Sequence, residues 1–288
     1  WAFAIDTTGS FTLENSEFNG FNKGFRLIGS GIHTINNSVM SFSGPMFDVS
    51  GNGRLHTLST TLSTTAEFGH LSGVDSFWSG DNLNGGSASD GLELVSGKHV
   101  FDSTTYARNY LYADSTSFGL GVTWATVEAD GLILSGWSDG IQCRIDCLVS
   151  GTSLTTNLGG VASGSGINID GGSVILDTLI TGNSFNGIHL EEGDLHIGDW
   201  TGSGHGGVTL LVDVDSTATV RNFPAYSSNG LWDAEGDGNL LFGGVNARIA
   251  TASYDEFTES TISVSDLSSI PLVGVSVEAH GFKELTDS

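Results

Sequence analysis

The sequence predicts an all-β fold: a right-handed parallel β-helix, or β-solenoid, in which short strands stack coil upon coil. Two observations carry this prediction. Apolar residues recur at a nearly constant step along the chain, and within each repeat they alternate with polar residues. A step of about 22 residues is typical of solenoids, and a period of two is typical of β-strands.

The repeat is clearest in two blocks of the chain. In the first block a constant step aligns the pairs Phe3/Ile5, Phe25/Leu27 and Phe47/Val49. In the second block a step of nearly the same length aligns Ile167/Ile169, Ile188/Leu190, Leu210/Val212 and Trp232/Ala234. Such agreement at several positions predicts that equivalent residues stack in columns along the solenoid.

Each repeat contains three short apolar–polar alternations, separated by clusters of Gly, Asn, Asp or Ser. We therefore expect three strands and three bends in each coil. The whole chain then makes 12 or 13 coils and a rod about 60 Å long, at about 4.8 Å per coil. Asn15 and Asn37 lie one coil apart and predict a short asparagine ladder at a bend. No segment has convincing helical periodicity.

The β-helix is expected to span residues 1–258, with irregular or inserted loops at about 59–140, where the repeat is hard to follow. Residues 259–288 are strand-like but out of step, and we interpret them as a cap or an edge between subunits. The chain begins at Trp1 without an initiator Met or a signal segment, which favours a processed piece of a longer, secreted precursor. Bare solenoid ends expose strand edges, so neighbouring domains or a second subunit would cover them.

The composition is strongly acidic, with 33 Asp and Glu against 9 Lys and Arg and a formal net charge of −24. Nucleic acids and anionic membranes need clustered basic residues, so both are excluded as partners. No apolar run approaches the roughly 20 residues of a membrane-spanning helix, so insertion into a membrane is excluded as well.

Cys143 and Cys147 are the only cysteines. On one extended strand their sulfur atoms would lie about 13 Å apart, too far for a disulfide. A turn between them would allow the bond. Both alternatives, buried free thiols and a disulfide, remain open from the sequence.

The G-(I/L/F)-x-(L/I) step, seen in Gly187-Ile188-His189-Leu190 and in Gly24-Phe25-Arg26-Leu27, resembles that of the right-handed, pectate-lyase-like β-helix superfamily. The resemblance covers about three quarters of the chain and concerns architecture only. It implies an alternative function as a carbohydrate-active enzyme or a polysaccharide-binding module.

Under that alternative, the catalytic candidates are Asp139, Asp170, His205 and Arg221. Gly204-His205-Gly206 is similar to a segment of the polygalacturonase-like members. However, the paired aspartates of those enzymes and their Arg-x-Lys segment are missing, and acid/base cleavage of glycosides needs two carboxyl groups. The leading prediction is therefore that the chain has no catalytic residues.

An aromatic-rich stretch supplies the sugar-binding candidates under the same alternative, because aromatic rings can stack on sugars. These candidates are Tyr106, Tyr110, Tyr112 and Trp124.

Calcium is the one cofactor that the sequence suggests. Asp233, Glu235 and Asp237 alternate oxygen ligands before Gly238, as calcium loops require. The twelfth position of such a loop would be Gly244, so the bidentate carboxylate is missing, and a coil turn explains Asp and Gly equally well.

The sequence as a whole favours a structural protein outside the cell or on its surface: a filament, sheath or adhesin subunit with the β-helix as a stiff acidic rod. Expected partners are other copies of the chain or neighbouring domains of a precursor, with polysaccharide as the partner under the alternative.

Overall fold

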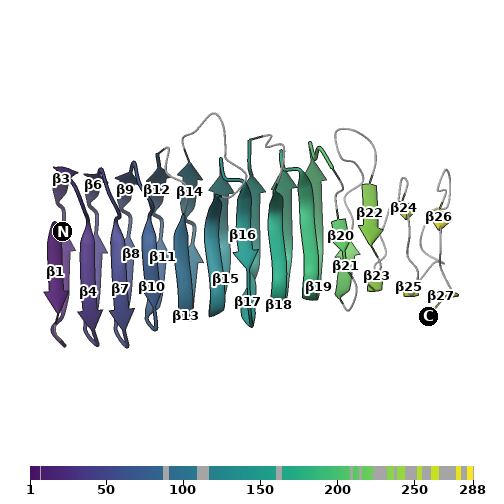
Figure 1. The fold of residues 1–288 in the computed structure, drawn as a ribbon, viewed down its shortest axis with the longest axis horizontal. Coiled ribbons are helices and arrows are strands. Elements are labelled where there is room, and N and C mark those ends of the chain that lie inside the picture. Colours follow the sequence, from purple (N-terminus) through teal and green to yellow (C-terminus); the bar gives the residue numbers. More distant parts are fainter. Residues whose placement is uncertain are drawn as a thin grey trace.

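The computed structural model is a parallel β-solenoid whose coils follow one another along one long axis (Figure 1). It has about nine turns of about 22 residues each. This confirms the predicted fold class and coil length, whereas the number of turns is below the 12 or 13 expected from the sequence. The structure describes residues 1–6, 8–86, 91–108, 117–159, 164–207, 210–213, 216–222, 232–236, 239–243, 252–254, 261–265, 277–279 and 284–287. This part of the chain contains no helix, and hence none able to cross a lipid bilayer.

The strands form three stacks, and each regular coil contributes one strand to every stack. Stack 1 contains β1 (Phe3–Asp6), β4 (Phe25–Gly29), β7 (Phe47–Gly51), β10 (Gly69–Ser72), the first parts of β13 (Leu92–Asp102) and β15 (Phe118–Ser135), β16 (Asp139–Cys143), and the first parts of β18 (Ser165–Gly182) and β19 (Asn186–Ser203).

Stack 2 contains β2 (Phe11–Glu14), β5 (Ile32–Asn36), β8 (Arg54–Leu58), β11 (Asp75–Ser79) and the following parts of β13, β15, β17 (Cys147–Asn157), β18 and β19. Stack 3 contains β3 (Glu17–Phe21), β6 (Val39–Phe42), β9 (Thr61–Thr64), β12 (Asn82–Gly85), β14 (Thr105–Arg108) and the last parts of β15, β17, β18 and β19.

Eight short strands continue the parallel pairing toward the C-terminus. They are β20 (Leu210–Val212), β21 (Thr217–Asn222), β22 (Trp232–Gly236), β23 (Asn239–Gly243), β24 (Ala252–Tyr254), β25 (Thr261–Ser265), β26 (Val277–Ala279) and β27 (Glu284–Asp287). Within the C-terminal segment 259–288, β25, β26 and β27 thus pair in parallel with strands of preceding coils.

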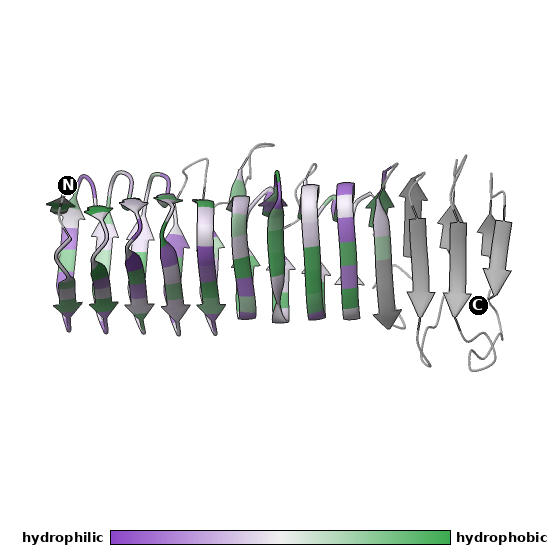
Figure 2. Cartoon of the chain, turned by 90° about the horizontal axis from the view of Figure 1, so that it is seen from below, coloured by the Kyte–Doolittle hydropathy of each residue, from purple (hydrophilic) through white to green (hydrophobic). Residues whose placement is uncertain are grey.

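The register between coils is the register that the repeat predicts. Phe3 pairs with Phe25, and Phe25 with Phe47, so their rings stack with centroids 5.1 and 5.6 Å apart. In the second block Ile167 pairs with Ile188. Apolar and polar residues alternate as bands along the strands (Figure 2). The inward residues form one continuous hydrophobic cluster from Phe25 to Ala218, because every coil places its apolar side chains over those of its neighbours.

Coil strands also run through residues 59–140, where the sequence repeat is hardest to follow. Here β9 to β15 pair in parallel with their neighbours. Leu92 pairs with Leu120 of the next coil, a longer step along the chain than the one from Phe25 to Phe47. The periodicity fades in the sequence because the coils differ in length, while the strand positions still stack.

The bend between stacks 2 and 3 repeats one backbone conformation. Asn15, Asn37 and Ser59 in successive coils have φ values of 49°, 45° and 52°, in the left-handed region that Asn tolerates better than most residues. The Asn37 Nδ2 donates a hydrogen bond to the Asn15 Oδ1 at 2.7 Å, and this confirms the predicted asparagine ladder.

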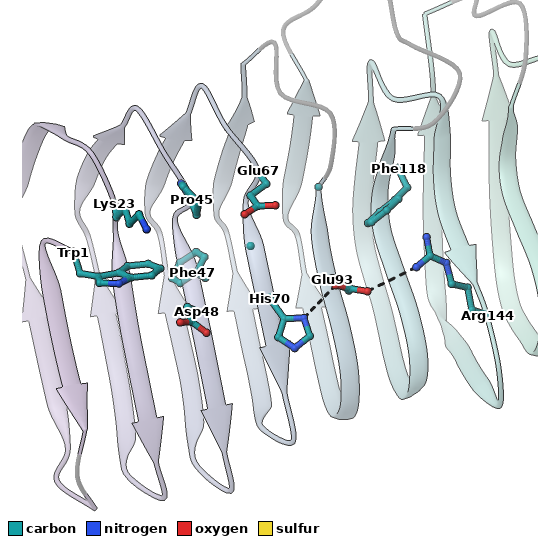
Figure 3. Close-up of a pocket in the computed structure, with 12 residues that line it drawn as sticks. Trp1, Lys23, Pro45, Phe47, Asp48, Glu67, His70, Glu93, Phe118 and Arg144 are labelled. Atoms are coloured by element: carbon teal, nitrogen blue, oxygen red, sulfur yellow. Dashed lines mark hydrogen bonds and ion pairs between the residues drawn. The ribbon is translucent and has the colours of Figure 1, made fainter.

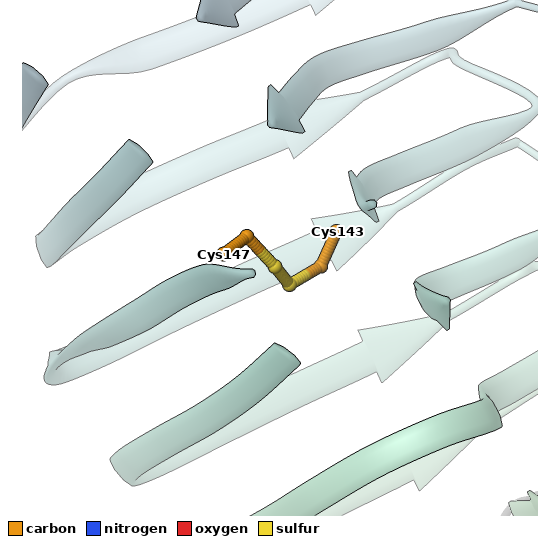
Figure 4. The surroundings of a disulfide bond; sticks show 2 residues. All are labelled: Cys143 and Cys147. Atoms are coloured by element: carbon orange, nitrogen blue, oxygen red, sulfur yellow. A yellow bond between two sulfur atoms is a disulfide. The ribbon is translucent and has the colours of Figure 1, made fainter. Parts of the chain in front are cut away.

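Cys143 and Cys147 form a disulfide across the turn between β16 and β17 (Figure 4). Asp146 has a φ of 49°, and the turn brings the two Cα atoms to 5.7 Å. Of the two alternatives that the sequence left open, the structure has the disulfide. Gly172 of the next coil lies against it: a Cβ at that position would be 2.7 Å from the Cys147 Sγ.

We expect the Cys143→Ser, Cys147→Ser double variant to lose about 2 kcal/mol of unfolding free energy, because the bond closes only a short loop. Urea unfolding of the variant and of the native chain, each with and without reductant, measures this loss. Reductant should lower the midpoint of the native chain alone; an equal drop in the double variant would contradict the prediction.

Candidate functional site

The four catalytic candidates do not come together. Asp139 begins β16 in stack 1, and Asp170 lies at the opposite end of the stack 1 part of β18. His205 follows the stack 3 part of β19, and Arg221 lies in β21 of stack 2, with its side chain outside the described residues. Asp139 and His205 share the bend between stacks 3 and 1 but lie about three coils apart, and Asp170 lies at the bend between stacks 1 and 2, so this set makes no acid/base pair.

Asp139 and His205 have structural partners instead. The Asp139 carboxylate accepts hydrogen bonds from the Ser165 backbone N and the Gln142 Nε2, both at 2.6 Å, and it is 8% exposed. The His205 ring lies 3.1 Å from the Thr181 Oγ1 and 2.9 Å from the Ser184 Oγ. Burial lowers the pKa of His205 to about 4, so the ring is neutral at pH 7 and ties two coils together.

The proposed sugar-binding aromatics also separate. Tyr106 is fully buried, with its ring edge-on to those of Phe68 and Trp137 at 4.6 and 4.9 Å, so it belongs to the core and cannot stack on a sugar. This corrects the expectation for Tyr106. Trp124 is 56% exposed at the bend between stacks 1 and 2, while Tyr110 and Tyr112 lie outside the described residues.

The calcium candidates fall in and beside β22. Asp233 and Glu235 lie on that strand with side chains outside the described part, and Asp237 is itself outside it. Across the residues that the structure describes, no group of three or more His, Cys, Asp or Glu side chains is placed to hold a metal ion.

A groove of about 550 Å³ on the outer face of stack 1 is the best-developed candidate site (Figure 3). Its lining includes Trp1, Lys23, Asp48, Glu67, His70, Glu93, Phe118 and Arg144. Because side chains alternate along a strand, the outward position of each stack 1 strand adds one residue to a column along the groove. In the register between coils, Arg26, Asp48, His70 and Glu93 follow one another in this column.

The side chains of this column pair with one another. The Arg26 Nε lies 3.5 Å from an Asp48 carboxylate oxygen, and the His70 Nδ1 lies 3.2 Å from the Glu93 Oε2. The Arg144 Nη1 reaches the Glu93 Oε1 at 3.7 Å from the far side (Figure 3). Each pair is partly exposed and contributes about 1 kcal/mol or less. Arg26 and Arg144 therefore offset the charges of Asp48 and Glu93, and these pairs add little to the stability of the fold.

Arg144 is the most connected residue of the groove. Its guanidinium lies 5.0 Å from the Phe118 ring centroid, and its Nη2 donates to the Gln142 Oε1 at 2.6 Å. Gln142 in turn donates to Asp139, so a chain of hydrogen bonds runs from the groove to a buried carboxylate. The Arg144 guanidinium over the Phe118 ring offers hydrogen-bond donors, and the Glu93 carboxylate offers acceptors. Such a set of groups can bind polar, hydroxylated ligands.

The sequence contained a signal for the groove that sequence reasoning missed. Arg26, Asp48 and His70 follow one another at the same step as Phe25 and Phe47, and Glu93 follows at nearly that step. The same step that aligns the core also aligns these charged positions. Only their alternation between Arg or His and an acidic residue, once the step is known, distinguishes a paired column from scattered surface charge.

A buried polar chain crosses the core beside stack 2. The Trp78 Nε1 donates to the Ser76 Oγ at 2.8 Å, the Ser76 Oγ lies 2.8 Å from the His99 Nδ1, and the His99 Nε2 lies 3.1 Å from the Ser96 carbonyl oxygen. Burial lowers the pKa of His99 to about 4. The neutral ring satisfies all these partners if Nε2 carries the proton, so the chain is a structural network.

Comparisons with models of protein families, with curated proteins and with solved structures found no match.

Proposed function

We propose that this chain is a non-enzymatic, extracellular structural protein: a filament, sheath or adhesin subunit that uses the solenoid as a stiff acidic rod. The proposal rests mainly on the column of Arg26, Asp48, His70 and Glu93 in the stack 1 groove, which we call the paired column. Its charged groups are spread one per coil and engaged with one another, whereas a catalytic site converges its groups on one reacting atom.

Two further observations support the proposal. A single hydrophobic cluster runs through the coils from Phe25 to Ala218, so bending the rod would open contacts between every pair of coils. The disulfide supports a location outside the cell, because such bonds persist in oxidising compartments and are rare in the cytosol.

The proposal includes the finer assignment to the right-handed, pectate-lyase-like β-helix superfamily. The apolar step of stack 1, whose residues stack from coil to coil, supports it. That superfold hosts enzymes and passive spacers alike, so the assignment does not by itself decide the function.

Negative-stain electron microscopy of the purified chain, with and without millimolar calcium, tests the structural role. We expect filaments or sheets with a repeat near the length of one rod, about 43 Å for about nine turns at about 4.8 Å per turn. Separate short rods at every concentration, together with cleavage of a polysaccharide in a reducing-end assay, would contradict the proposal. The calcium-free sample also tests whether the candidate ligands of β22 matter for assembly.

The groove supports polysaccharide binding as a second candidate function, because Arg144 lies over Phe118 beside Glu93. A glycan array followed by titration calorimetry tests it. We expect Arg144→Gln to weaken binding about tenfold or more, since it removes the cation and its ion pair. Arg54→Gln is the matched control, because Arg54 is exposed on stack 2, away from the groove. Equal affinity in both variants would exclude the groove as the binding site.

A further inference from the structure

The outer face of stack 3 differs in charge from the rest of the described surface. From β6 to the stack 3 part of β18, its outward positions hold only Thr, Ser, Asn, Ala, Gly, Val and Ile. We refer to these positions as the neutral face. The first outward position of each strand forms a column that runs from Val39 through Thr61, Asn82 and Thr105 to Ile133, Thr155 and Ile180.

An uncharged face of this length is unexpected in a chain with 33 acidic and 9 basic residues. The face also exposes three large apolar side chains in this column: Val39 is 51% exposed, Ile133 is 41% exposed and Ile180 is 43% exposed. Side chains of this kind pack well against another pleated sheet. The outer face of stack 1, by contrast, carries the paired column of Arg, Asp, His and Glu.

The two edges of the neutral face are unlike each other. On the stack 2 side, Asp102 and Asp130 end the stack 2 strands just before the bend, and neighbouring Ser and Thr hydroxyls donate to both carboxylates. On the opposite side, a trough of about 350 Å³ is lined by uncharged residues that include Ser43, Thr65 and Gly86. The two acidic residues therefore flank β14 and the stack 3 part of β15, and the uncharged trough flanks β6, β9 and β12.

The area of the face suits a weak but specific contact between two copies. The stack 3 strands from β6 to β18 cover about 34 Å along the rod at about 4.8 Å per strand, and four residues span about 13 Å. This gives about 440 Å² per copy and about 900 Å² for a pair, which is in the range of weak, transient interfaces.

We propose that the neutral face is the surface through which two copies of this chain associate side by side, sheet against sheet. The proposal rests on the structural role proposed above and names the surface that such an assembly uses. A second copy is the favoured occupant because two chains of charge −24 repel each other, and here they can approach without opposing carboxylates. A glycan is less suited, since no outward side chain of the face is aromatic.

The charge on the edges also selects the direction of the two rods. A two-fold axis parallel to the rods places Asp102 and Asp130 of the two copies at opposite edges of the pair, so these carboxylates do not face one another. An axis across the rods would place them on the same edge of the pair, which is repulsive. The rods in the pair therefore run parallel, and equivalent coils of the two copies lie opposite each other.

Matched isoleucine variants test the surface in the full chain. We expect Ile133→Glu and Ile180→Glu to weaken self-association about tenfold or more in sedimentation velocity, because each buries a carboxylate opposite a like charge. Ile175→Glu is the control: Ile175 is 47% exposed, but it lies on the outer face of stack 2. Its association constant should change less than threefold, roughly the effect of one exposed charge.

Cross-linking tests the parallel arrangement, because both native cysteines are engaged in the disulfide. A short bis-maleimide should couple Thr61→Cys to itself and Thr155→Cys to itself in the dimer, since equivalent coils face each other. Coupling between a Thr61→Cys copy and a Thr155→Cys copy, without self-coupling, would overturn the parallel arrangement. Circular dichroism melting confirms that each variant is folded.

The outcomes separate this proposal from the structural role on which it rests. A native chain that associates, with all three glutamate variants weakened equally or none weakened, overturns the neutral face but leaves the structural role standing. A native chain that stays monomeric at all salt concentrations overturns both. If the monomer instead binds a neutral polysaccharide and Ile133→Glu abolishes that binding, the face is a glycan surface and the proposal of a second copy is wrong.

Discussion

Acidification from pH 7 to pH 4 should remove about 3 kcal/mol of unfolding free energy through His99 alone. The His99 pKa is lowered to about 4 in the folded chain, because the ring is fully buried, and it is about 6.5 when unfolded. Between these values the unfolded state binds more protons, so stability is complete above pH 6.5 and is lost as the pH falls to 4. A difference of this size corresponds to about 3 kcal/mol.

Urea unfolding at several pH values between 7 and 4 measures this loss. Asp and Glu side chains titrate in part of the same pH range. The contribution of His99 is therefore the difference in pH dependence between the variants. His99→Gln should flatten the pH dependence relative to the native chain, since it removes the titrating ring. His196→Gln, which removes an exposed histidine on stack 2, should leave the profile unchanged. Equal profiles for His99→Gln and the native chain would contradict the assignment.

His205 adds a smaller contribution of the same sign. Burial lowers its pKa to about 4 as well, but the residue is only half-buried. Its Thr181 partner also accepts a hydrogen bond from the Trp200 Nε1 at 2.9 Å, so protonation would disturb two coils. A structural rod with these histidines should therefore loosen in acid from two points along its core.

Replacement of Asp81 by alanine should cost about 4 kcal/mol, the range found when one partner of a buried charged network is removed. The carboxylate is 2% exposed. It accepts hydrogen bonds from the Thr57 Oγ1 at 2.6 Å, from the Thr60 N and Oγ1 at 2.8 Å each, and from the Ser79 N at 3.1 Å. Burial raises the pKa of Asp81, and the bonds from Thr57 and Thr60 oppose the rise.

Urea unfolding at pH 7 checks the Asp81 prediction, with an unchanged m-value as the sign that the same fold unfolds. Asp75→Ala is the matched control, because Asp75 is exposed and accepts one hydrogen bond, from the Lys98 N at 3.0 Å. It should cost less than about 1 kcal/mol. A small loss for Asp81→Ala would mean that water replaces the carboxylate at this bend.

The burial of Asp81 and its hydrogen-bond partners could not be predicted from the sequence. In the sequence, Asp81 follows Gly80 at the end of an apolar–polar alternation, as an exposed turn residue would. Only the stacking of coils brings Thr57 and Thr60 of the preceding coil onto its carboxylate. A residue type common in surface turns therefore becomes a buried acceptor, because the neighbouring coil covers the bend.

The same distinction applies to the other predictions: some features could be predicted from the sequence, and others depend on the fold. The core columns, the coil length and the Asn15–Asn37 ladder were predictable, because burial enforces the same residue type at the same step in every coil. The catalytic candidates were chosen by motif, and motifs say nothing about which edge of the coil a residue occupies. Tyr106 illustrates the failure: its ring could have faced outward or inward, and the pleat turned it inward between Phe68 and Trp137.

The sequence by itself determined the architecture of this protein, because a solenoid is built from local repeats and each repeat carries its own strand and turn signals. Tertiary structure alone decided which charged residues meet, that the two cysteines join, and that one face stays neutral from β6 to β18. These properties depend on contacts between successive coils and on the direction in which each side chain points. The period shows that a position recurs in every coil. Whether the side chain at that position faces the core, an ion pair or another molecule depends on the folded coil.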